Sequence, residues 1–272
     1  MDEMKVRGFV TPEDFCGTDA EKIQKAIFTA EEKDIRKVVI TGTYKTDKTL
    51  VIPENMYIVL KDVNLSVTGD FPLFENFGRN NKQAGYAFEE DRFYIEGENA
   101  DLCGDIVFYN ANRVVVNGVK LNGRMYFEFT RESRVQNNEI RGENAVVLAR
   151  GCNNFIIENT KAETGGAAVV MDTSKTENPY VIGKSAEISL VILKDSDLMT
   201  QSPAIALEAT ESDRIFNIVI ENNKIYGTAM SVSAKAGALN AEQYLDITAE
   251  EFISSSKPEF AINSPMKHCY IK

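Results

Sequence analysis

Asp172 and Glu208 are the acidic residues whose positions most directly suggest chemistry. Each ends a short apolar stretch, AAVVMD for the first and AIALE for the second, and we expect these stretches to be neighbouring parallel strands. The two side chains then point to one face, with their Cβ atoms about 5 Å apart. A carboxyl separation of roughly 5–5.5 Å is the geometry of a retaining glycosidase. Glu128, two repeats away, is a third candidate acid.

The same face carries candidate substrate-binding residues. Tyr109 and Tyr126 can offer flat surfaces for sugar rings, and Arg150 can steer a carboxylate or hydroxyl group. A structural interpretation stays open for all of these residues. Acidic side chains on an outward face are usually just solvated, and tyrosines are common on sheet surfaces. Glu128 can equally pair with Arg131 or Arg150.

A repeated pattern between residues 104 and 235 must position these side chains. Each block consists of a short apolar strand, a polar turn, a second apolar strand and an Asn-rich turn. One block cannot bury its apolar face alone, whereas stacked blocks bury a continuous core, which is the logic of a solenoid. The strands are short and rich in Val, Ile and Phe, which predicts β-coils. The blocks include DIVFYNANRVVVNG, MYFEFTRESRVQNN, NAVVLARGCNNFIIEN and AIALEATESDRIFNIVIENN.

Alternation along the first strand of each block predicts which residues face inward. The predicted inward pairs are Ile106/Phe108, Phe127/Phe129, Val146/Leu148, Val169/Met171, Ile205/Leu207 and Met230/Val232. The outward residues then form two columns, Val107, Glu128, Val147, Val170, Ala206, Ser231 and Tyr109, Thr130, Ala149, Asp172, Glu208, Ser233. The insertion TSKTENPYVIGKSAE, residues 173–187, should loop out beside this face.

Asn-rich turns recur on the second strands, at Asn137, Asn159, Asp195 and Asn222. Asparagine tolerates a left-handed backbone and can hydrogen-bond along a stack. We therefore interpret this column as a structural ladder.

Both ends of the solenoid carry predicted caps. Residues 18–33 form a helix with Ile23, Ala26, Ile27 and Ala30 on one face and Thr18 or Asp19 as N-cap. Such a helix protects the open edge of the coils. At the other end we expect a short helix at 247–256 followed by the extended piece EFAINSP.

Residues 37–104, after the N-terminal helix, predict the first coils. We expect strands near 38–41, 49–52, 56–60 and 64–67, and a return to strand and tight turn over 92–104. Residues 70–90 are polar and predict a long loop, which is often functional when it covers a site.

The composition and charge of the chain exclude some classes of binding partner. The net charge of −11 disfavours nucleic acid and anionic membranes. No apolar run approaches the roughly 18 residues needed to span a bilayer. The N-terminus has no signal-like apolar segment, so the expected location is cytoplasmic if that terminus is native. The four cysteines match no zinc or redox spacing, and we expect reduced structural thiols, no metal and no cofactor.

The opening segment resembles the pectin-lyase-like superfamily. The matching elements are the helix from Ala20 to Ile27, the strand pair at Gly42–Tyr44, and the LVIPEN stretch at Leu50–Asn55. The later coils resemble polygalacturonase-type glycoside hydrolases, and the similarity covers residues 10–235. It implies an all-β, right-handed parallel β-helix over residues 1–272, with a cap at 1–36, coils at 37–235 and a cap or tail at 236–272. The same opening occurs in phage tail-spike proteins.

The polygalacturonase motifs N-T-D, D-D, G-H-G and R-I-K are replaced in this sequence. Their positions hold Gly142–Glu143–Asn144, Gly166–Ala167, Ser202–Pro203–Ala204 and Ser231–Val232–Ser233. The family's acid and base are therefore missing, and an atypical pair such as Asp172 and Glu208 has to supply them. We predict a protein that binds or cleaves a glycan. The alternatives are a catalytically inactive glycan-binding or structural β-helix and a tail-spike-like adhesin, and the oligomeric state is open.

Overall fold

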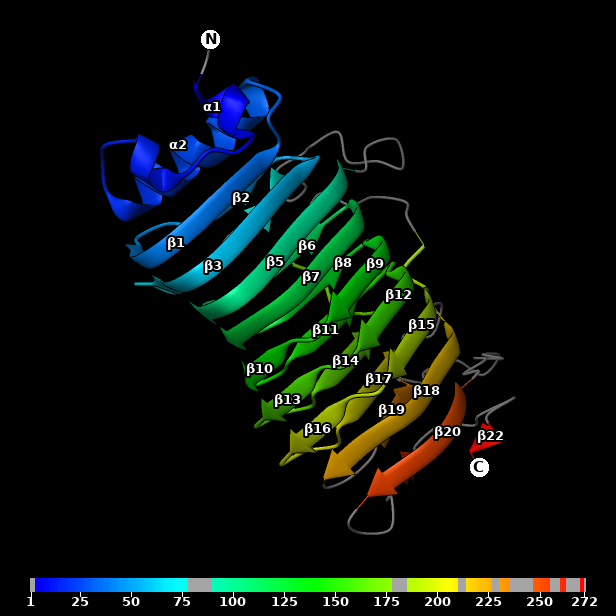
Figure 1. The fold of residues 1–272 in the computed structure, drawn as a ribbon. Coiled ribbons are helices and arrows are strands. Elements are labelled where there is room, and N and C mark those ends of the chain that lie inside the picture. Colours follow the sequence, from blue (N-terminus) through cyan, green and yellow to red (C-terminus); the bar gives the residue numbers. More distant parts are fainter. Residues whose placement is uncertain are drawn as a thin grey trace.

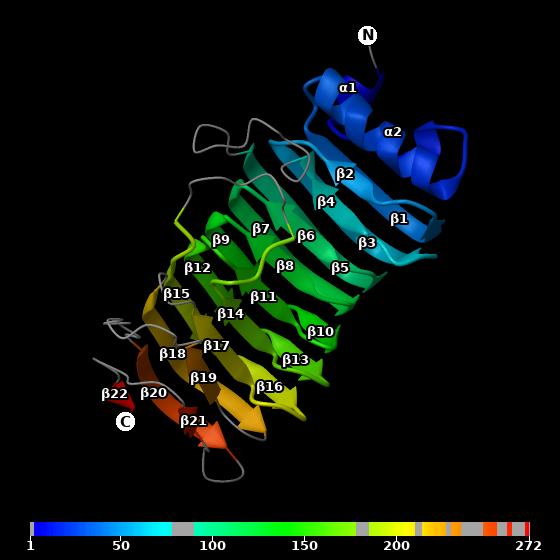
Figure 2. The ribbon, with the colours of Figure 1, turned by 180° about the vertical axis from the view of Figure 1, so that it is seen from behind.

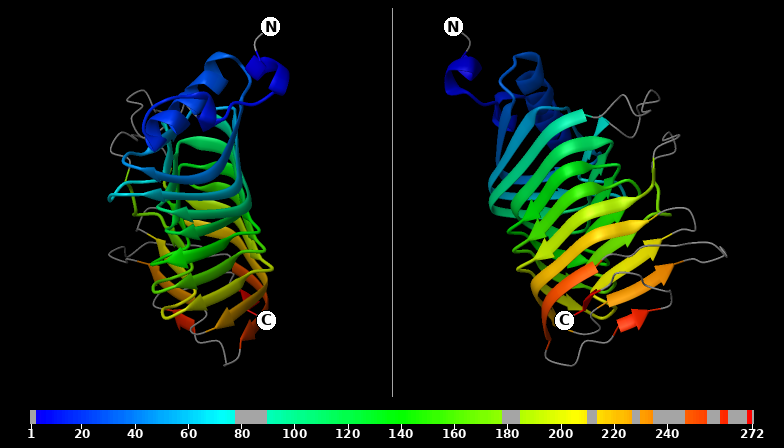
Figure 3. Two further views of the ribbon diagram at one scale, coloured as in Figure 1. Left: turned by 60° about the vertical axis from the view of Figure 1, so that its left-hand side comes forward. Right: turned by 90° about the vertical axis from the view of Figure 1, so that its right-hand side faces the viewer.

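The computed structural model describes residues 3–77, 90–177, 185–209, 214–226, 230–234, 247–254, 260–262 and 270–271. The chain winds into a parallel β-helix, with strands stacked coil upon coil along one axis and two helices at the N-terminal end (Figure 1). Side views show the coils following one another from these helices to the C-terminal strands (Figure 3). The predicted all-β solenoid is confirmed.

Each coil combines a long strand, or two shorter arms, with one short strand. The N-terminal elements are α1 (Glu3–Arg7), a 3-10 turn (Pro12–Asp14) and α2 (Asp19–Glu32). The long strands and arms are β1 (Lys37–Thr46), β3 (Met56–Val67), β5 (Glu90–Cys103), β7 (Ala111–Asn122), β9 (Arg131–Gln136), β10 (Glu139–Gly142), β12 (Asn153–Glu158), β13 (Lys161–Thr164), β15 (Ile188–Lys194), β16 (Asp197–Thr200), β18 (Ile215–Tyr226), β20 (Ile247–Ser254) and β22 (Tyr270–Ile271). The short strands are β2 (Leu50–Ile52), β4 (Phe74–Asn76), β6 (Ile106–Tyr109), β8 (Met125–Glu128), β11 (Val146–Ala149), β14 (Val169–Asp172), β17 (Ile205–Ala209), β19 (Met230–Ala234) and β21 (Phe260–Ile262).

Two sheets wrap the core. Within the described ranges, the long strands form a 13-stranded sheet, here called the long-strand sheet, and the short strands form a 9-stranded sheet, the short-strand sheet. Each coil pairs in parallel with the next, so one strand direction runs through the whole stack. Residues at equal register positions therefore form columns along the helix axis.

The core is a continuous interior of apolar side chains between the two sheets. Phenylalanines stack through its middle, with ring centroids 5.1 Å apart for Phe93 and Phe108, 6.0 Å for Phe108 and Phe127, and 4.8 Å for Phe127 and Phe155. All four side chains are fully buried. Burying a side chain of this kind contributes about 1.5–3 kcal/mol, so the repeat itself supplies the stability of the fold.

The predicted Asn ladder marks the bend between the two arms of the long strand in four successive coils, from β9 to β18. Asn137, Asn159, Asp195 and Asn222 all have left-handed backbones, with φ between 48° and 57°. Asn137 Nδ2 donates to Oδ1 of Asn117 at 2.8 Å, and Asn222 Nδ2 donates to Oδ1 of Asp195 at 2.5 Å. The ladder therefore satisfies the bend with residues that accept this conformation at little cost.

A second ladder lies inside the same bend and was not predicted. The Asn138 side chain accepts from Val119 N at 3.0 Å and donates to the Val116 carbonyl at 3.1 Å. In a later coil, Asn223 accepts from Ser196 N at 3.0 Å. These buried side chains bind backbone groups that the turn leaves outside the sheet ladders.

Helix α2 covers the open N-terminal end of the coils, as predicted. Thr18 is its N-cap, accepting from Glu21 N, while the Glu21 carboxylate accepts from Thr18 N at 3.1 Å, a reciprocal capping box. The buried face comprises Ala20, Ile23, Ala26, Ile27 and Ala30. These residues close the apolar core where the first coil would otherwise expose it.

The register of β8 corrects one prediction. Phe127 pairs with Phe108 and Glu128 with Tyr109, so the inward pair is Met125/Phe127 and not Phe127/Phe129. Both alternatives are apolar in the sequence MYFEF, and alternation could not separate them. Phe129 instead has a left-handed backbone with φ of 50°, which ends the strand. Glu128 therefore takes the column position predicted for Thr130.

Three further boundaries differ from prediction. The 70–90 loop contains β4, which pairs Phe74 with Ile106, while residues 78–89 lie outside the described ranges. The predicted strands 56–60 and 64–67 are two arms of β3, bent at the left-handed Asp62. The helix predicted at 247–256 is wrong, because residues 247–254 form β20, and residues 255–256 lie outside the described ranges. Strand β20 pairs with β18, where the stacked edge offers backbone partners that an isolated short helix lacks.

Candidate functional site

The outer face of the short-strand sheet holds all the candidate site residues except Arg150, which follows β11. Register places Val107, Tyr126, Val147, Val170 and Ala206 in one outward column, and Tyr109, Glu128, Ala149, Asp172 and Glu208 in the next. The face therefore has two parts. The part over β6, β8 and β11 is aromatic and apolar apart from Glu128, and the part over β14 and β17 carries two carboxylates.

Asp172 and Glu208 lie directly opposite each other on adjacent strands, as predicted. Asp172 is 9% exposed, and its Oδ1 accepts hydrogen bonds from Ser174 N at 2.8 Å and Ser174 Oγ at 2.6 Å. Glu208 is half-buried, and its carboxylate has no hydrogen-bond or ion-pair partner among the described residues. One carboxylate is thus fixed by its own turn, and its neighbour is available to a ligand.

Glu128 is fully buried and saturated with donors. Its Oε1 accepts from Arg150 Nε at 3.1 Å and from Thr176 Oγ1 at 2.6 Å. Its Oε2 accepts from Tyr126 Oη at 2.9 Å and from Glu177 N at 2.8 Å. The ion pair with Arg150 is the structural alternative that the sequence left open. In this arrangement Glu128 fastens the start of the 173–187 insertion to the sheet.

Tyr109 and Tyr126 are both 0% exposed, so neither ring presents a face to solvent. Their centroids lie 5.8 Å apart, and Tyr109 Oη donates to Glu177 Oε2 at 3.3 Å. Arg124 binds the same Glu177 carboxylate at 3.0 Å and stacks on Tyr126. Burial raises the pKa of the Tyr126 hydroxyl, and the neighbouring Glu128 charge raises it further. The two tyrosines therefore contact the insertion and Glu128 instead of facing solvent.

These contacts fill the aromatic part of the face. In Figure 2 the chain leaving β14, drawn in yellow-green, passes in front of the short-strand sheet, and Thr176 and Glu177 reach back to Glu128. Beneath them lies a second apolar cluster, separate from the main core, formed by Val107, Tyr109, Tyr126, Val147, Ala149, Ala167 and Val170. The described residues therefore close the predicted groove over β8 and leave the half-buried Glu208 carboxylate accessible on β17.

The turns that lead into the short strands β11, β14 and β17 stack on one another from coil to coil. Gly142 pairs with Thr164, and Thr164 pairs with Thr200, so the turns that follow them stack on one another. Within this stack, Gly166 N donates to the Glu143 carbonyl at 2.7 Å. The segments Glu143–Asn144, Gly166–Ala167 and Ser202–Pro203–Ala204 therefore lie in equivalent turns of successive coils.

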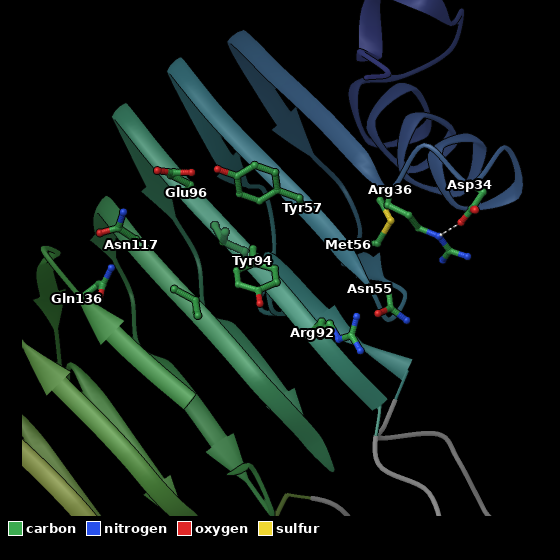
Figure 4. A pocket seen from close by; sticks show the side chains of 12 residues that line it. Asp34, Arg36, Asn55, Met56, Tyr57, Arg92, Tyr94, Glu96, Asn117 and Gln136 are labelled. Carbon is green, nitrogen blue, oxygen red and sulfur yellow. Dashed lines mark hydrogen bonds and ion pairs between the residues drawn. The ribbon is translucent and has the colours of Figure 1, made fainter. Parts of the chain in front are cut away.

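A groove that sequence reasoning missed lies on the long-strand sheet. The groove consists of two adjoining hollows, and the larger one has a volume of about 790 Å³ and runs over β3, β5 and β7 (Figure 4). Tyr57 and Tyr94 lie in its centre, with Glu96, Asn117 and Gln136 to one side. The signal that could have found it is the position of each tyrosine directly after an inward residue, Met56 or Phe93, which aligns the two rings.

Within the described part of the chain, no group of three or more His, Cys, Asp or Glu side chains is arranged to hold a metal ion. No described helix is long and apolar enough to cross a membrane. Cys16, Cys103 and Cys152 are free thiols, with Cys152 buried.

Comparison with known proteins identifies the fold. No protein-family model matches the sequence, and no curated protein matches it. Among solved structures, the surface adhesin PfbA of Streptococcus pneumoniae aligns with a TM-score of 0.59 at 12% identity, over 93% of this chain and 82% of PfbA. The tailspike protein of E. coli bacteriophage HK620, in complex with a pentasaccharide, aligns with a TM-score of 0.50 at 11% identity. That alignment covers 92% of this chain and 51% of the tailspike, so this chain spans about half of its length. These likenesses confirm the predicted right-handed parallel β-helix.

Proposed function

We propose that this chain acts on carbohydrate at the outer face of the short-strand sheet, with Asp172 and Glu208 as the carboxylate pair of a glycosidase-type site. The observation that carries the proposal is their direct register on β14 and β17. Adjacent parallel strands are about 4.8 Å apart, which suits a retaining pair. The absence of hydrogen-bond partners for Glu208 among the described residues supports its contact with a ligand.

The chemistry follows from that spacing. One carboxyl group protonates the glycosidic oxygen while the other carboxylate attacks the anomeric carbon, giving a covalent glycosyl intermediate. Water then attacks the same carbon, with the first group acting as base, so the sugar keeps its anomeric configuration. Asp172, held rigidly by Ser174, suits the role of nucleophile, and the longer side chain of Glu208 suits proton transfer.

The fold comparison supports a carbohydrate ligand without fixing its identity. The HK620 tailspike, which shares this fold, is in complex with a pentasaccharide, and PfbA is a surface adhesin. The proposed binding roles of Tyr109, Tyr126 and Arg150 require Thr176 and Glu177 to leave the face, because these two residues now contact that part of it.

A second candidate function is a non-catalytic β-helix that binds glycans or serves as a structural or adhesive module. The specific observation in its favour is the closure of the aromatic part of the face. Glu128, placed where a catalytic acid was predicted, instead has four donors and no exposed surface. A module of this kind has the same β-helix fold but does not cleave the glycan.

The two candidates are separated by incubating the protein with neutral and acidic oligosaccharides and reading the products by mass spectrometry. Asp172→Asn and Glu208→Gln are run beside the wild type, with Asp197→Asn as a matched control on β16. Cleavage by the wild type and the control, lost in both pair variants, supports the glycosidase-type site. If both Asp172→Asn and Glu208→Gln still cleave, the proposed site is wrong. If the folded wild type cleaves nothing, the non-catalytic module is favoured.

A further inference from the structure

A groove on the outer face of the long-strand sheet is built from three columns that run along the helix axis. The floor is the column in which Tyr57 pairs with Tyr94, Tyr94 with Val115, Val115 with Arg134, and Arg134 with Ile156. Tyr57 meets Tyr94 edge-on, with centroids 6.1 Å apart and planes at 87°. Tyr94 is 38% exposed, so it offers a ring surface that its neighbour holds in place.

The two sides of the groove are polar. One side is the column two residues further along each strand, where Glu96 pairs with Asn117 and Asn117 with Gln136. The other side is a column of left-handed residues, with φ of 62° at Arg92, 56° at Arg113, 51° at Glu132 and 55° at Asn154. This conformation is uncommon for bulky residues.

Two hollows join into one groove along these columns. The first has a volume of about 790 Å³ and the second about 500 Å³. They share Tyr94, Val115 and Gln136 in their linings, so the groove continues from β3 across β5, β7 and β9 to β12. Both volumes fall in the range of about 300–1,000 Å³ typical of ligand sites. The long axis follows the stacking direction and not the strands.

The charges that line the larger hollow balance. Asp34 binds Arg36 at 2.8 Å, and the other two charged residues of the lining, Arg92 and Glu96, are opposite in sign. Figure 4 shows Arg36 and Arg92 at one end and Glu96 across the tyrosines from them. A lining with balanced charges on a chain of net charge −11 gives no attraction to an anionic ligand. It suits a neutral ligand that presents many hydroxyl groups.

Hydrogen-bonding groups in the groove remain available for such a ligand. The Glu96 carboxylate and the hydroxyls of Tyr57 and Tyr94 have no hydrogen-bond partner among the described residues. Asn117 uses its Oδ1 to accept from Asn137, and Gln136 uses its Oε1 to accept from Arg134 at 3.4 Å. Both side-chain NH₂ groups therefore remain as donors on the same side of the groove as Glu96.

We propose that this groove binds a neutral, linear oligosaccharide lying along the helix axis. Tyr94 stacks on a sugar ring, and Glu96, Asn117 and Gln136 bind its hydroxyls. Successive coils are about 4.8 Å apart, close to the length of one sugar residue in an extended chain, so successive coils can contact successive sugar residues. The groove lies on a different sheet from Asp172 and Glu208 and holds the glycan without cleaving it.

The test measures binding by isothermal titration calorimetry with neutral gluco-, manno- and galacto-oligosaccharides from disaccharide to hexasaccharide, beside oligouronates. We expect a neutral series to bind, with affinity rising with length. Tyr94→Ala should weaken binding by up to about tenfold, because stacking on an aromatic ring is worth about 0.5–1.5 kcal/mol. Tyr94→Phe should retain most of it. Tyr226→Ala removes a tyrosine of similar exposure, 41%, on β18 and should change nothing.

Three results would each overturn the proposal: no neutral oligosaccharide binds, oligouronates bind more tightly, or Tyr94→Ala binds as well as Tyr226→Ala. Tyr94 points outward, so its loss should leave the fold intact, which circular dichroism checks. Titrating the Asp172→Asn/Glu208→Gln double variant separates this inference from the proposed activity. Its groove binding should equal that of the wild type, whether or not the wild type cleaves any glycan.

Discussion

Asp172 and Glu208 occupy the same register position on two adjacent parallel strands, although the insertion at 173–187 separates them in the sequence. Asp172 is held by Ser174, whereas Glu208 has no partner among the described residues. Two like charges placed directly opposite each other in a sheet oppose folding. Glu208 adds this repulsion and gains no contact among the described residues in return, which function explains better than packing.

Replacing Glu208 by Gln should therefore leave the protein as stable or make it slightly more stable. Relief of the repulsion from Asp172 is worth about 0.2–1 kcal/mol, and the gain should shrink in high salt. Urea unfolding of wild type and variant at low and high ionic strength measures it. A loss of stability in the variant would mean that Glu208 makes a stabilising contact and would weaken its assignment to a ligand.

Glu128 has the opposite role, because it holds the insertion to the sheet. Glu128→Gln should cost about 3 kcal/mol, since it leaves the Arg150 charge without its buried partner. Glu163→Gln is the control, because Glu163 pairs with Arg141 at the surface, where both side chains are more than half exposed. That change should cost less than about 1 kcal/mol.

Equal destabilisation by the two substitutions in chemical denaturation would contradict this account of Glu128. Limited proteolysis gives a second measurement. Glu128 accepts hydrogen bonds from Thr176 and Glu177, so its loss should speed cleavage within the insertion before the coils are cut.

The inner ladder predicts a further stability difference. Asn138→Ala removes the acceptor for Val119 N and the donor for the Val116 carbonyl, and both groups then stay buried. Each unsatisfied group costs about 1–3 kcal/mol, so the variant should lose at least about 2 kcal/mol. Asn122→Ala, at an exposed position on β7, should change the free energy of unfolding by less than about 0.5 kcal/mol. Comparable losses in both would show that the ladder is not what stabilises the bend.

Much of the architecture could be predicted from the sequence because several blocks of the repeat carry the same pattern of inward residues. Leu148, Met171 and Leu207 recur in the same context, and each predicts the same inward position. The Asn137 column was predictable for the same reason, since few residues other than Asn, Asp and Gly take that backbone readily. The adjacency of Asp172 and Glu208 followed from aligning these inward residues.

Other features depended on information that a single strand does not hold. The β8 register was ambiguous because Met125, Phe127 and Phe129 are all apolar and alternate. The burial of Tyr109 and Tyr126 depends on where the insertion folds back, and no local pattern encodes that contact. The groove at Tyr94 was missed because it arises from register among coils, while each tyrosine alone is an ordinary strand residue.

Cys152 should be unreactive in the folded protein. Burial raises the pKa of its thiol to about 12, so the reactive thiolate is negligible at neutral pH and at pH 9. Cys16 and Cys103 are exposed. Iodoacetamide followed by peptide mass spectrometry should label those two within the time that leaves Cys152 unmodified, and urea should remove the difference. Rapid labelling of Cys152 without urea would mean that its site opens.

The measurement that tests the central claim most directly is proton NMR of the anomeric signals while the wild type acts on an oligosaccharide panel. The account predicts cleavage in which the first-formed product keeps the anomeric configuration of the substrate, because adjacent strands place the two carboxylates close together. Inversion of that configuration, an unsaturated product typical of a lyase, or an unchanged spectrum from folded protein would contradict it.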